Sequence, residues 1–132
     1  MAMFPSRLQN WRKARAFIED FCKGAEVPRE TCLKANLVIE ELFLNTVKHG
    51  HRGGSDAPVW ITLEADDGRI SLAYEDSAPP FNPFSSATRE MLEALAESRR
   101  EGGLGVLLAN SLTHSADYSY VFGRNRIRLT VS

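Results

Sequence analysis

The stretch that decides the fold is residues 29–50, RETCLKANLVIEELFLNTVKHG. Its apolar side chains recur around most of the helical circumference, which predicts a helix over about 29–48 that is buried on several sides. Glu41, Asn45 and His49 fall on one face of this helix, at positions i, i+4 and i+8. A carboxylate and an amide in such surroundings need a partner. The pair either faces a ligand, lies on a thin solvent stripe or caps a neighbouring turn, and the apolar surroundings favour the ligand.

The residues on either side of this helix predict the other elements. Before it, Ser6 is in position to cap a first helix, with Gln9 three residues later, and Gly24 ends that helix. After it the pattern predicts two hairpins and two more helices. The hairpin strands are 59–63 with 70–74 and 116–122 with 126–131, and the helices are 86–100 and 106–112. Strands joined by tight turns predict a largely antiparallel sheet with helices on one face, which is an α+β domain.

The composition is that of an ordinary globular domain. The chain has 132 residues, a formal net charge of −1, 43% hydrophobic and 25% charged residues, so we expect one domain, 1–132. A near-neutral chain gives no electrostatic reason to expect nucleic acid, and no apolar run reaches the roughly 20 residues of a membrane helix. No secretory signal is visible, and Cys22 and Cys32 form no disulfide framework. We therefore expect a cytoplasmic protein.

A second polar position follows the predicted strand 70–74. Asp76 stands at the strand end, before a loop that contains Pro79, Pro80 and Pro83. There a carboxylate can accept a hydrogen bond from a ligand, such as an exocyclic amine, beside a stiff loop. An aspartate that forms a turn is the common alternative.

The third motif is the glycine loop Gly102-Gly103-Leu104-Gly105, which opens into an apolar helix. Glycines let the backbone approach a ligand, and the helix start offers free N–H groups that suit phosphate. A helix C-cap followed by a tight turn is the alternative. No Lys-Ser or Lys-Thr follows as in a Walker loop, and Leu108 stands where a dinucleotide fingerprint has its third glycine.

Taken in order, the three motifs resemble the N, G1 and G2 boxes of the GHKL ATPase superfamily, which includes DNA gyrase, histidine kinases and mismatch-repair ATPases. Within it the chain is most similar to the bacterial anti-sigma-factor serine kinases, through its bare single domain, its Gly-Gly-Leu-Gly box and the closing Gly123-Arg124-Asn125-Arg126-Ile127. The resemblance covers nearly the whole chain. It implies a two-layer α/β sandwich of the GHKL (Bergerat) type, with a mixed, mostly antiparallel sheet and helices on one face.

The resemblance also implies roles for individual residues. Asn45 would give its amide oxygen to Mg²⁺, Asp76 would accept from the adenine amine, and Glu41 would be the general base. Gly103 and Gly105 would present backbone N–H groups to the phosphates. The nucleotide-binding positions implied in this way are Asn45, Asp76, Ala78, Phe81, Gly103, Leu104, Gly105 and Thr130.

The function implied is that of an ATP- and Mg²⁺-dependent serine/threonine protein kinase. It would sequester a sigma factor and phosphorylate an anti-anti-sigma antagonist, form a homodimer, and contact neither nucleic acid nor membrane. Arg89, Arg99 and Arg100 lie in or after the segment that forms the ATP lid in the family, where one of them could reach the γ-phosphate. For each of these arginines a solvated helix face is an equal alternative.

Two departures from the family pattern keep a second interpretation open. Ala78 stands where the G1 box has its first glycine, and Asn82 stands where the later aspartate is usual. Because Ala78 adds a methyl group where backbone approaches adenine, the alternative is a nucleotide-gated interaction module with weak or no kinase activity. A detached histidine-kinase catalytic domain and a water-using ATPase rank lower. The spacing of the three histidines and two cysteines matches no zinc site.

Overall fold

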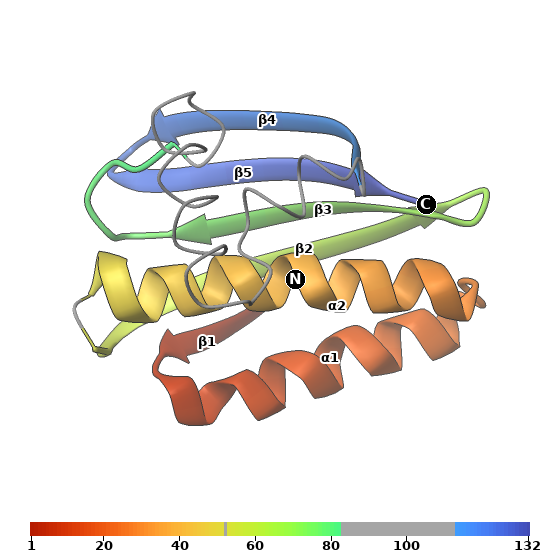
Figure 1. The fold of residues 1–132 in the computed structure, drawn as a ribbon, viewed down its shortest axis with the longest axis horizontal. Helices are drawn as coiled ribbons and strands as arrows, with labels where there is room; N and C mark the ends of the chain where they lie inside the picture. The colour runs from red at the N-terminus through yellow and green to blue at the C-terminus, as the bar shows by residue number, and fades with distance from the viewer. Residues whose placement is uncertain (52, 83–112) are drawn as a thin grey trace, which may run out of the picture.

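Two helices cover one face of a five-stranded antiparallel sheet (Figure 1) in the computed structural model, which describes residues 1–51, 53–82 and 113–132. The strands are β1 (Ala2–Ser6), β2 (Ser55–Asp66), β3 (Arg69–Asp76), β4 (Thr113–Val121) and β5 (Arg124–Val131), in the order β1-β2-β3-β5-β4. The helices are α1 (Trp11–Gly24) and α2 (Arg29–Asn45), with a short 3-10 turn η1 (Leu8–Asn10) before α1 and a π-helical turn η2 (Thr46–Gly50) after α2. This arrangement confirms the predicted α+β class.

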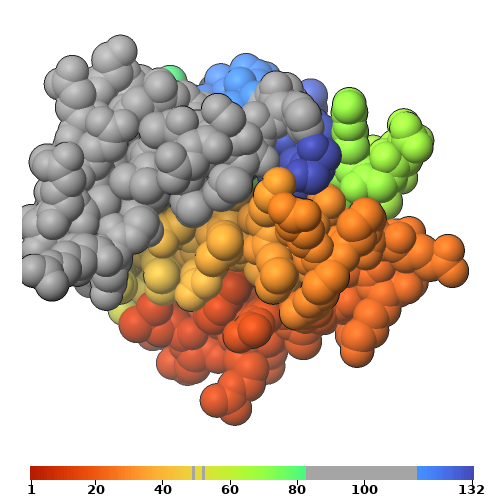
Figure 2. Space-filling view, turned by 45° about the vertical axis from the view of Figure 1, so that its right-hand side comes forward, coloured from red at the N-terminus to blue at the C-terminus, as the bar shows by residue number. Residues whose placement is uncertain are grey.

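The core fills the space between the helices and the facing side of the sheet. Alternate residues of β2, β3 and β5 point toward the helices, as the period of two requires. The almost completely buried side chains include Ile18, Val38, Ile39, Phe43, Val59, Ile61, Ile70, Tyr74, Leu129 and Val131. Near the N-terminal end of α2, the last residues of the chain lie against the helix (Figure 2). There Lys34 Nζ donates to the Ser132 carbonyl at 2.9 Å.

The N-terminal strand β1 corrects the prediction for the first residues. Ser6 does not cap a helix: it is the last residue of β1, and its Oγ donates to the Ala57 carbonyl at 2.7 Å. The first helix therefore begins at Trp11, after η1. The predicted strand 59–63 also extends to Ser55 and Asp66, because β1 pairs with β2 on one edge and β3 pairs with it on the other.

The predicted helix over 29–48 is divided at its C-terminal end. The α-helix ends at Asn45, and the chain continues in η2, closed by a bond from the His51 N–H to the Thr46 carbonyl at 2.9 Å. The Thr46 hydroxyl lies 2.9 Å from the Leu42 carbonyl, within hydrogen-bond reach of the last regular turn of α2. Single π-turns of this kind often occur at functional sites.

Both predicted hairpins are present. Asp67-Gly68 joins β2 to β3, and Phe122-Gly123 joins β4 to β5; all four residues have positive φ, between 51° and 77°. The second turn lies one to two residues before the predicted 123–125. Every strand pair in the described residues is antiparallel, so that part of the sheet is not mixed. The predicted helices 86–100 and 106–112 lie outside the described residues, and no helix within the described ones could span a bilayer.

Candidate functional site

A cavity of about 160 Å³ opens where the end of α2 meets the ends of β3 and β5. Most of its wall is apolar, and the lining side chains that carry polar groups are those of Asn45, Thr46, Tyr74, Asp76 and Asn125. The lining residues are Leu42, Asn45, Thr46, Gly50, Tyr74, Asp76, Ala78, Pro79, Pro80, Phe81, Asn125 and Ile127. A largely apolar recess with a few placed polar groups is the common form of a small-molecule site.

Asp76 is the charged group of this cavity, and it is only 7% exposed. Its Oδ1 accepts from Asn125 Nδ2 at 2.8 Å and from the Ala78 N–H at 3.2 Å, and its Oδ2 accepts from Thr46 Oγ1 at 2.7 Å. A carboxylate offers about four acceptor positions. Three are used, so Asp76 retains capacity for one donor from a ligand.

Thr46 ties Asp76 to the core. Its Oγ1 also lies 2.6 Å from the Tyr74 hydroxyl. Complete burial raises the pKa of Tyr74 well above its ordinary value; the Thr46 hydrogen bond lowers that pKa and the nearby Asp76 charge raises it further. Tyr74 therefore keeps its proton and donates to Thr46, which leaves the single Thr46 proton for Asp76.

Asn125, the second residue of β5, holds the proline loop in place. Its Nδ2 has two hydrogens, which are shared among three acceptors: Asp76 Oδ1 at 2.8 Å and the Ala78 and Pro79 carbonyls at 3.1 and 3.0 Å. Its Oδ1 accepts from the Phe81 N–H at 2.9 Å and from the Tyr118 hydroxyl at 2.5 Å. The sequence pattern predicted Asn125 only as a turn residue and as part of the closing motif. The contacts of Asn125 with the proline loop and with Asp76 join residues 44 to 49 positions apart in the sequence. A local sequence pattern cannot predict such contacts.

Replacing Asn125 with alanine is expected to destabilise the protein by about 2–5 kcal/mol, because Phe81 N–H and two carbonyls lose their partner inside the site. The measurement is the free energy of unfolding from urea denaturation. Arg128→Ala is the control, since Arg128 is an exposed residue of the same strand and should change stability by less than about 0.5 kcal/mol. Equal stabilities of the two variants would contradict the assigned role of Asn125.

Ala78 fits the site because Gly50 faces it. A Cβ placed on Gly50 would lie 2.7 Å from the Ala78 Cβ, which is too close for two carbon atoms. The Gly50 φ is not positive, so an alanine there meets no backbone strain. The extra methyl group of Ala78 therefore occupies the space that the missing Gly50 side chain leaves.

Gly50→Ala is expected to destabilise the protein by about 1–3 kcal/mol through this overlap. Ala78→Gly in the same chain should restore most of the loss, so the two changes should couple rather than add. Urea denaturation of both single variants and the double variant measures the coupling. Simple additivity would show that the two residues do not contact each other.

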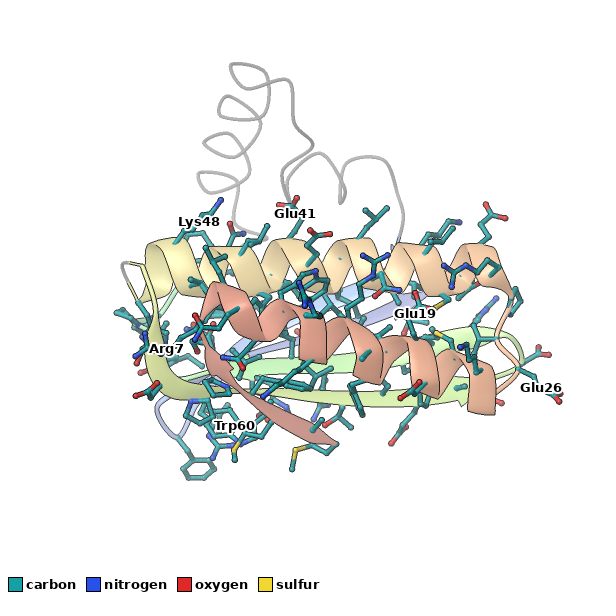
Figure 3. The ribbon with its side chains drawn as sticks, turned by 90° about the horizontal axis from the view of Figure 1, so that it is seen from below. Arg7, Glu19, Glu26, Glu41, Lys48 and Trp60 are labelled. Atoms are coloured by element: carbon teal, nitrogen blue, oxygen red, sulfur yellow. The ribbon has the colours of Figure 1, made fainter. Side chains whose placement is uncertain are left out.

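Asn45 and Glu41 come from the last two turns of α2. Asn45 lines the cavity, and its Nδ2 is buried with no hydrogen-bond partner in the part of the chain that the structure describes. An orphaned amide at a cavity wall fits a ligand oxygen, and exchange of the amide O and N would offer Oδ1 to a cation. Glu41 is half-buried one turn earlier, and Figure 3 shows it on the same side of α2 as Lys48.

Asn45 is compatible with Mg²⁺, which takes few protein ligands and keeps waters and phosphate oxygens. The described residues contain no group of three or more histidines, cysteines and carboxylates for a metal held by protein alone. A Mg²⁺ ion at Asn45 would take its other ligands from waters and phosphate oxygens.

The structure brings together some of the sequence-predicted residues and separates others. Asn45, Asp76, Ala78 and Phe81 line one cavity. Thr130 lies on the opposite face of the sheet, because it alternates with the buried Leu129 and Val131, and we leave it out of the site. Gly103, Leu104 and Gly105, like Arg89, Arg99 and Arg100, lie outside the described residues.

Comparisons with known proteins identify the family and the fold. A family model described as a histidine kinase-like ATPase domain matches residues 4–131. The chain is similar to a chain of the SiaB-SiaC complex from Pseudomonas aeruginosa, with a TM-score of 0.59 and 14% identity, covering 99% of this chain and 89% of that one. It is also similar to the catalytic domain of the histidine kinase ThkA in a nucleotide-free form, with a TM-score of 0.49, 12% identity and coverage of 99% and 97%. No curated protein sequence matches. The likeness to the SiaB-SiaC structure shows the shared fold.

Proposed function

Because this chain belongs to the histidine kinase-like ATPase domain family, we propose that it is an ATP-dependent serine/threonine protein kinase. In this proposal it also sequesters a sigma factor and phosphorylates an anti-anti-sigma antagonist. The observation that carries the nucleotide part is Asp76, a buried carboxylate on a cavity wall with three neutral donors and room for one more. The exocyclic amine of adenine is the donor that we assign to it.

The walls of the cavity suit a flat apolar base. Leu42, Phe81 and Ile127 come from α2, the proline loop and β5, and surround the carboxylate. Stacking on apolar and aromatic side chains, with one polar group to fix the orientation, gives both affinity and specificity. Asn125 would act indirectly, as a positioning residue that holds Asp76 and the loop.

The phosphates would extend from the base toward Asn45 and Glu41. In the transfer step, Glu41 takes the proton of a partner's serine or threonine hydroxyl, and the hydroxyl oxygen bonds to the γ-phosphorus. The bond from the γ-phosphorus to the bridging oxygen breaks, and ADP leaves with that electron pair. When bound at Asn45, Mg²⁺ would neutralise the phosphate charge. Gly103, Leu104 and Gly105 remain the residues proposed to meet the phosphates.

The partner proteins belong to the finer part of the proposal. One solved structure of this fold is a complex, SiaB-SiaC, which supports a protein partner here. The sigma factor and its antagonist rest on the sequence resemblance alone.

A nucleotide-gated interaction module is the second candidate, motivated by Ala78 at the position where the family pattern has a glycine. Titration calorimetry with ATP and Mg²⁺ separates the two functions when it is combined with transfer of labelled γ-phosphate. The acceptor would be a small single-domain protein with a phosphorylatable serine, encoded by a neighbouring gene. Binding with transfer supports the kinase, and binding without transfer supports the module. Absence of binding would remove both.

A further inference from the structure

Three polar groups surround the Thr46 hydroxyl at the wall of the cavity. Its Oγ1 lies 2.9 Å from the Leu42 carbonyl, 2.6 Å from the Tyr74 hydroxyl and 2.7 Å from Asp76 Oδ2. A threonine hydroxyl has a single proton to donate. The group that receives this proton therefore determines what Asp76 can offer to a ligand.

Tyr74 does not compete for the Thr46 proton, because it has a proton of its own to give. Its side chain is 1% exposed, and burial raises the pKa of its hydroxyl well above the ordinary value. The hydroxyl therefore stays protonated and donates to Thr46 Oγ1. A hydroxyl that accepts a hydrogen bond donates more strongly in turn, since such bonds polarise one another where the dielectric is low. Tyr74 thus strengthens Thr46 as a donor.

Asp76 is the stronger of the two remaining acceptors. The Leu42 carbonyl is neutral and already accepts from the Thr46 backbone N–H. Hydrogen bonds to an ionised acceptor are shorter and roughly twice as strong as those between neutral groups. The Thr46 proton therefore goes to Asp76, and both protons of the hydroxyl pair (Tyr74 and Thr46) are directed toward the carboxylate.

The hydroxyl pair acts on the oxygen that would meet a ligand. Asp76 Oδ1 accepts from Asn125 Nδ2 at 2.8 Å and from the Ala78 N–H at 3.2 Å. Oδ2 accepts from Thr46, so the position that is open to a further donor lies on Oδ2. That position carries a lone pair. It accepts an N–H group of a ligand and repels a carbonyl oxygen.

We propose that Tyr74 and Thr46 are positioning residues that determine purine specificity, because they fix Asp76 Oδ2 as an acceptor for a 6-amino purine rather than a 6-oxo purine. The inference rests on the proposed nucleotide function, and no sequence motif assigned a role to either residue. Without the Thr46 proton, Oδ2 loses its fixed donor. The carboxylate can then turn away from the direction in which the amine of the base arrives.

Titration calorimetry of the full chain with ATP and with ITP, each with Mg²⁺, tests this inference, because ITP has a carbonyl in place of the 6-amino group. The wild type is expected to bind ATP about 30-fold more tightly, the usual contribution of a hydrogen bond to a charged group. Thr46→Val should lower this preference about 10-fold and Tyr74→Phe about three-fold. Thr46→Ser keeps the hydroxyl and should keep the preference. Thr62→Val is the matched control, since Thr62 lines a hollow on the side of the sheet away from α1 and α2.

The double variant Thr46→Val, Tyr74→Phe separates specificity from stability. Thr46→Val removes the acceptor of the buried Tyr74 hydroxyl, which costs stability, and Tyr74→Phe then removes that hydroxyl as well. The double variant should therefore resist urea better than Thr46→Val and yet show the same low preference for ATP. A preference that recovers together with stability would overturn the inference, because the two residues would then only support the fold.

The wild type and the variants report on different claims. A wild type that binds neither nucleotide, or binds both equally, would contradict the assignment of the adenine amine to Asp76 and the inference with it. A wild type that prefers ATP, with single variants that keep this preference or lose affinity for ATP and ITP by the same factor, would contradict the role of the hydroxyl pair alone.

Discussion

Asp76→Asn is expected to weaken ATP binding by at least about 100-fold, equivalent to about 2.7 kcal/mol, in a protein that still folds. The asparagine Oδ1 can keep the bonds from Asn125 and the Ala78 N–H. Its Nδ2 would then face Thr46 Oγ1, which can turn its proton to the Leu42 carbonyl at 2.9 Å. The contact with Thr46 therefore survives with donor and acceptor exchanged. The position that would accept the adenine amine in the wild type becomes an N–H donor, which cannot accept it.

Titration calorimetry with ATP and Mg²⁺ measures this loss, and urea denaturation checks that the variant is folded. Asp117→Asn is the matched control, since Asp117 lies on the side of the sheet away from α1 and α2. An Asp76→Asn protein that binds ATP with the wild-type affinity would place the base elsewhere.

Glu41→Gln is expected to slow phosphoryl transfer to the protein partner by about 10²- to 10⁴-fold, the usual contribution of a general base. The glutamine has nearly the same shape but cannot take the hydroxyl proton. Asp76 and the apolar walls are unchanged, so ATP affinity should stay within a few-fold. Single-turnover transfer of labelled phosphate, measured beside nucleotide titration, separates the two quantities.

Glu40→Gln controls for the loss of one carboxylate from the same turn of α2 and should transfer phosphate at the wild-type rate. If Glu41→Gln also does so, Glu41 is not the base. If both variants bind ATP normally and the wild type transfers nothing, the interaction module becomes the better description.

The sequence predicted those parts of the fold that local patterns determine. The apolar spacing of 29–48 predicted α2, with Glu41 and Asn45 on one of its faces. Asp67-Gly68 predicted a hairpin turn, which the structure contains. β1 was missed because its five residues alternate only briefly, include Pro5 and pair with β2 more than 45 positions away. Ser6 matched the local pattern of a helix cap, but its hydroxyl donates instead to the Ala57 carbonyl, which is distant in the sequence.

The residues of the candidate site could likewise be predicted only in part. Asp76 could be singled out because a carboxylate follows a strand and precedes three prolines. Two of its partners could not, since Thr46 and Asn125 reach it across 30 and 49 positions, and only the fold makes them neighbours. The Ala78 N–H lies two positions away, and its bond is the local turn contact that an aspartate commonly makes. The contact of Ala78 with Gly50 likewise joins two segments that are separate in sequence. The departure from the family pattern was visible in the sequence, but the space that accommodates it was not.

The Asp76 cluster has a consequence for ionic strength. Its three donors are an amide, a backbone N–H and a hydroxyl, and among the residues that the structure describes no cationic side chain hydrogen-bonds to it. Dissolved salt screens attraction between exposed formal charges over about 8–10 Å at physiological concentrations, but it acts much less on short bonds in a buried pocket. Recognition of the base at Asp76 should thus persist in concentrated salt. Any weakening of nucleotide affinity by salt would then report on the phosphate end alone.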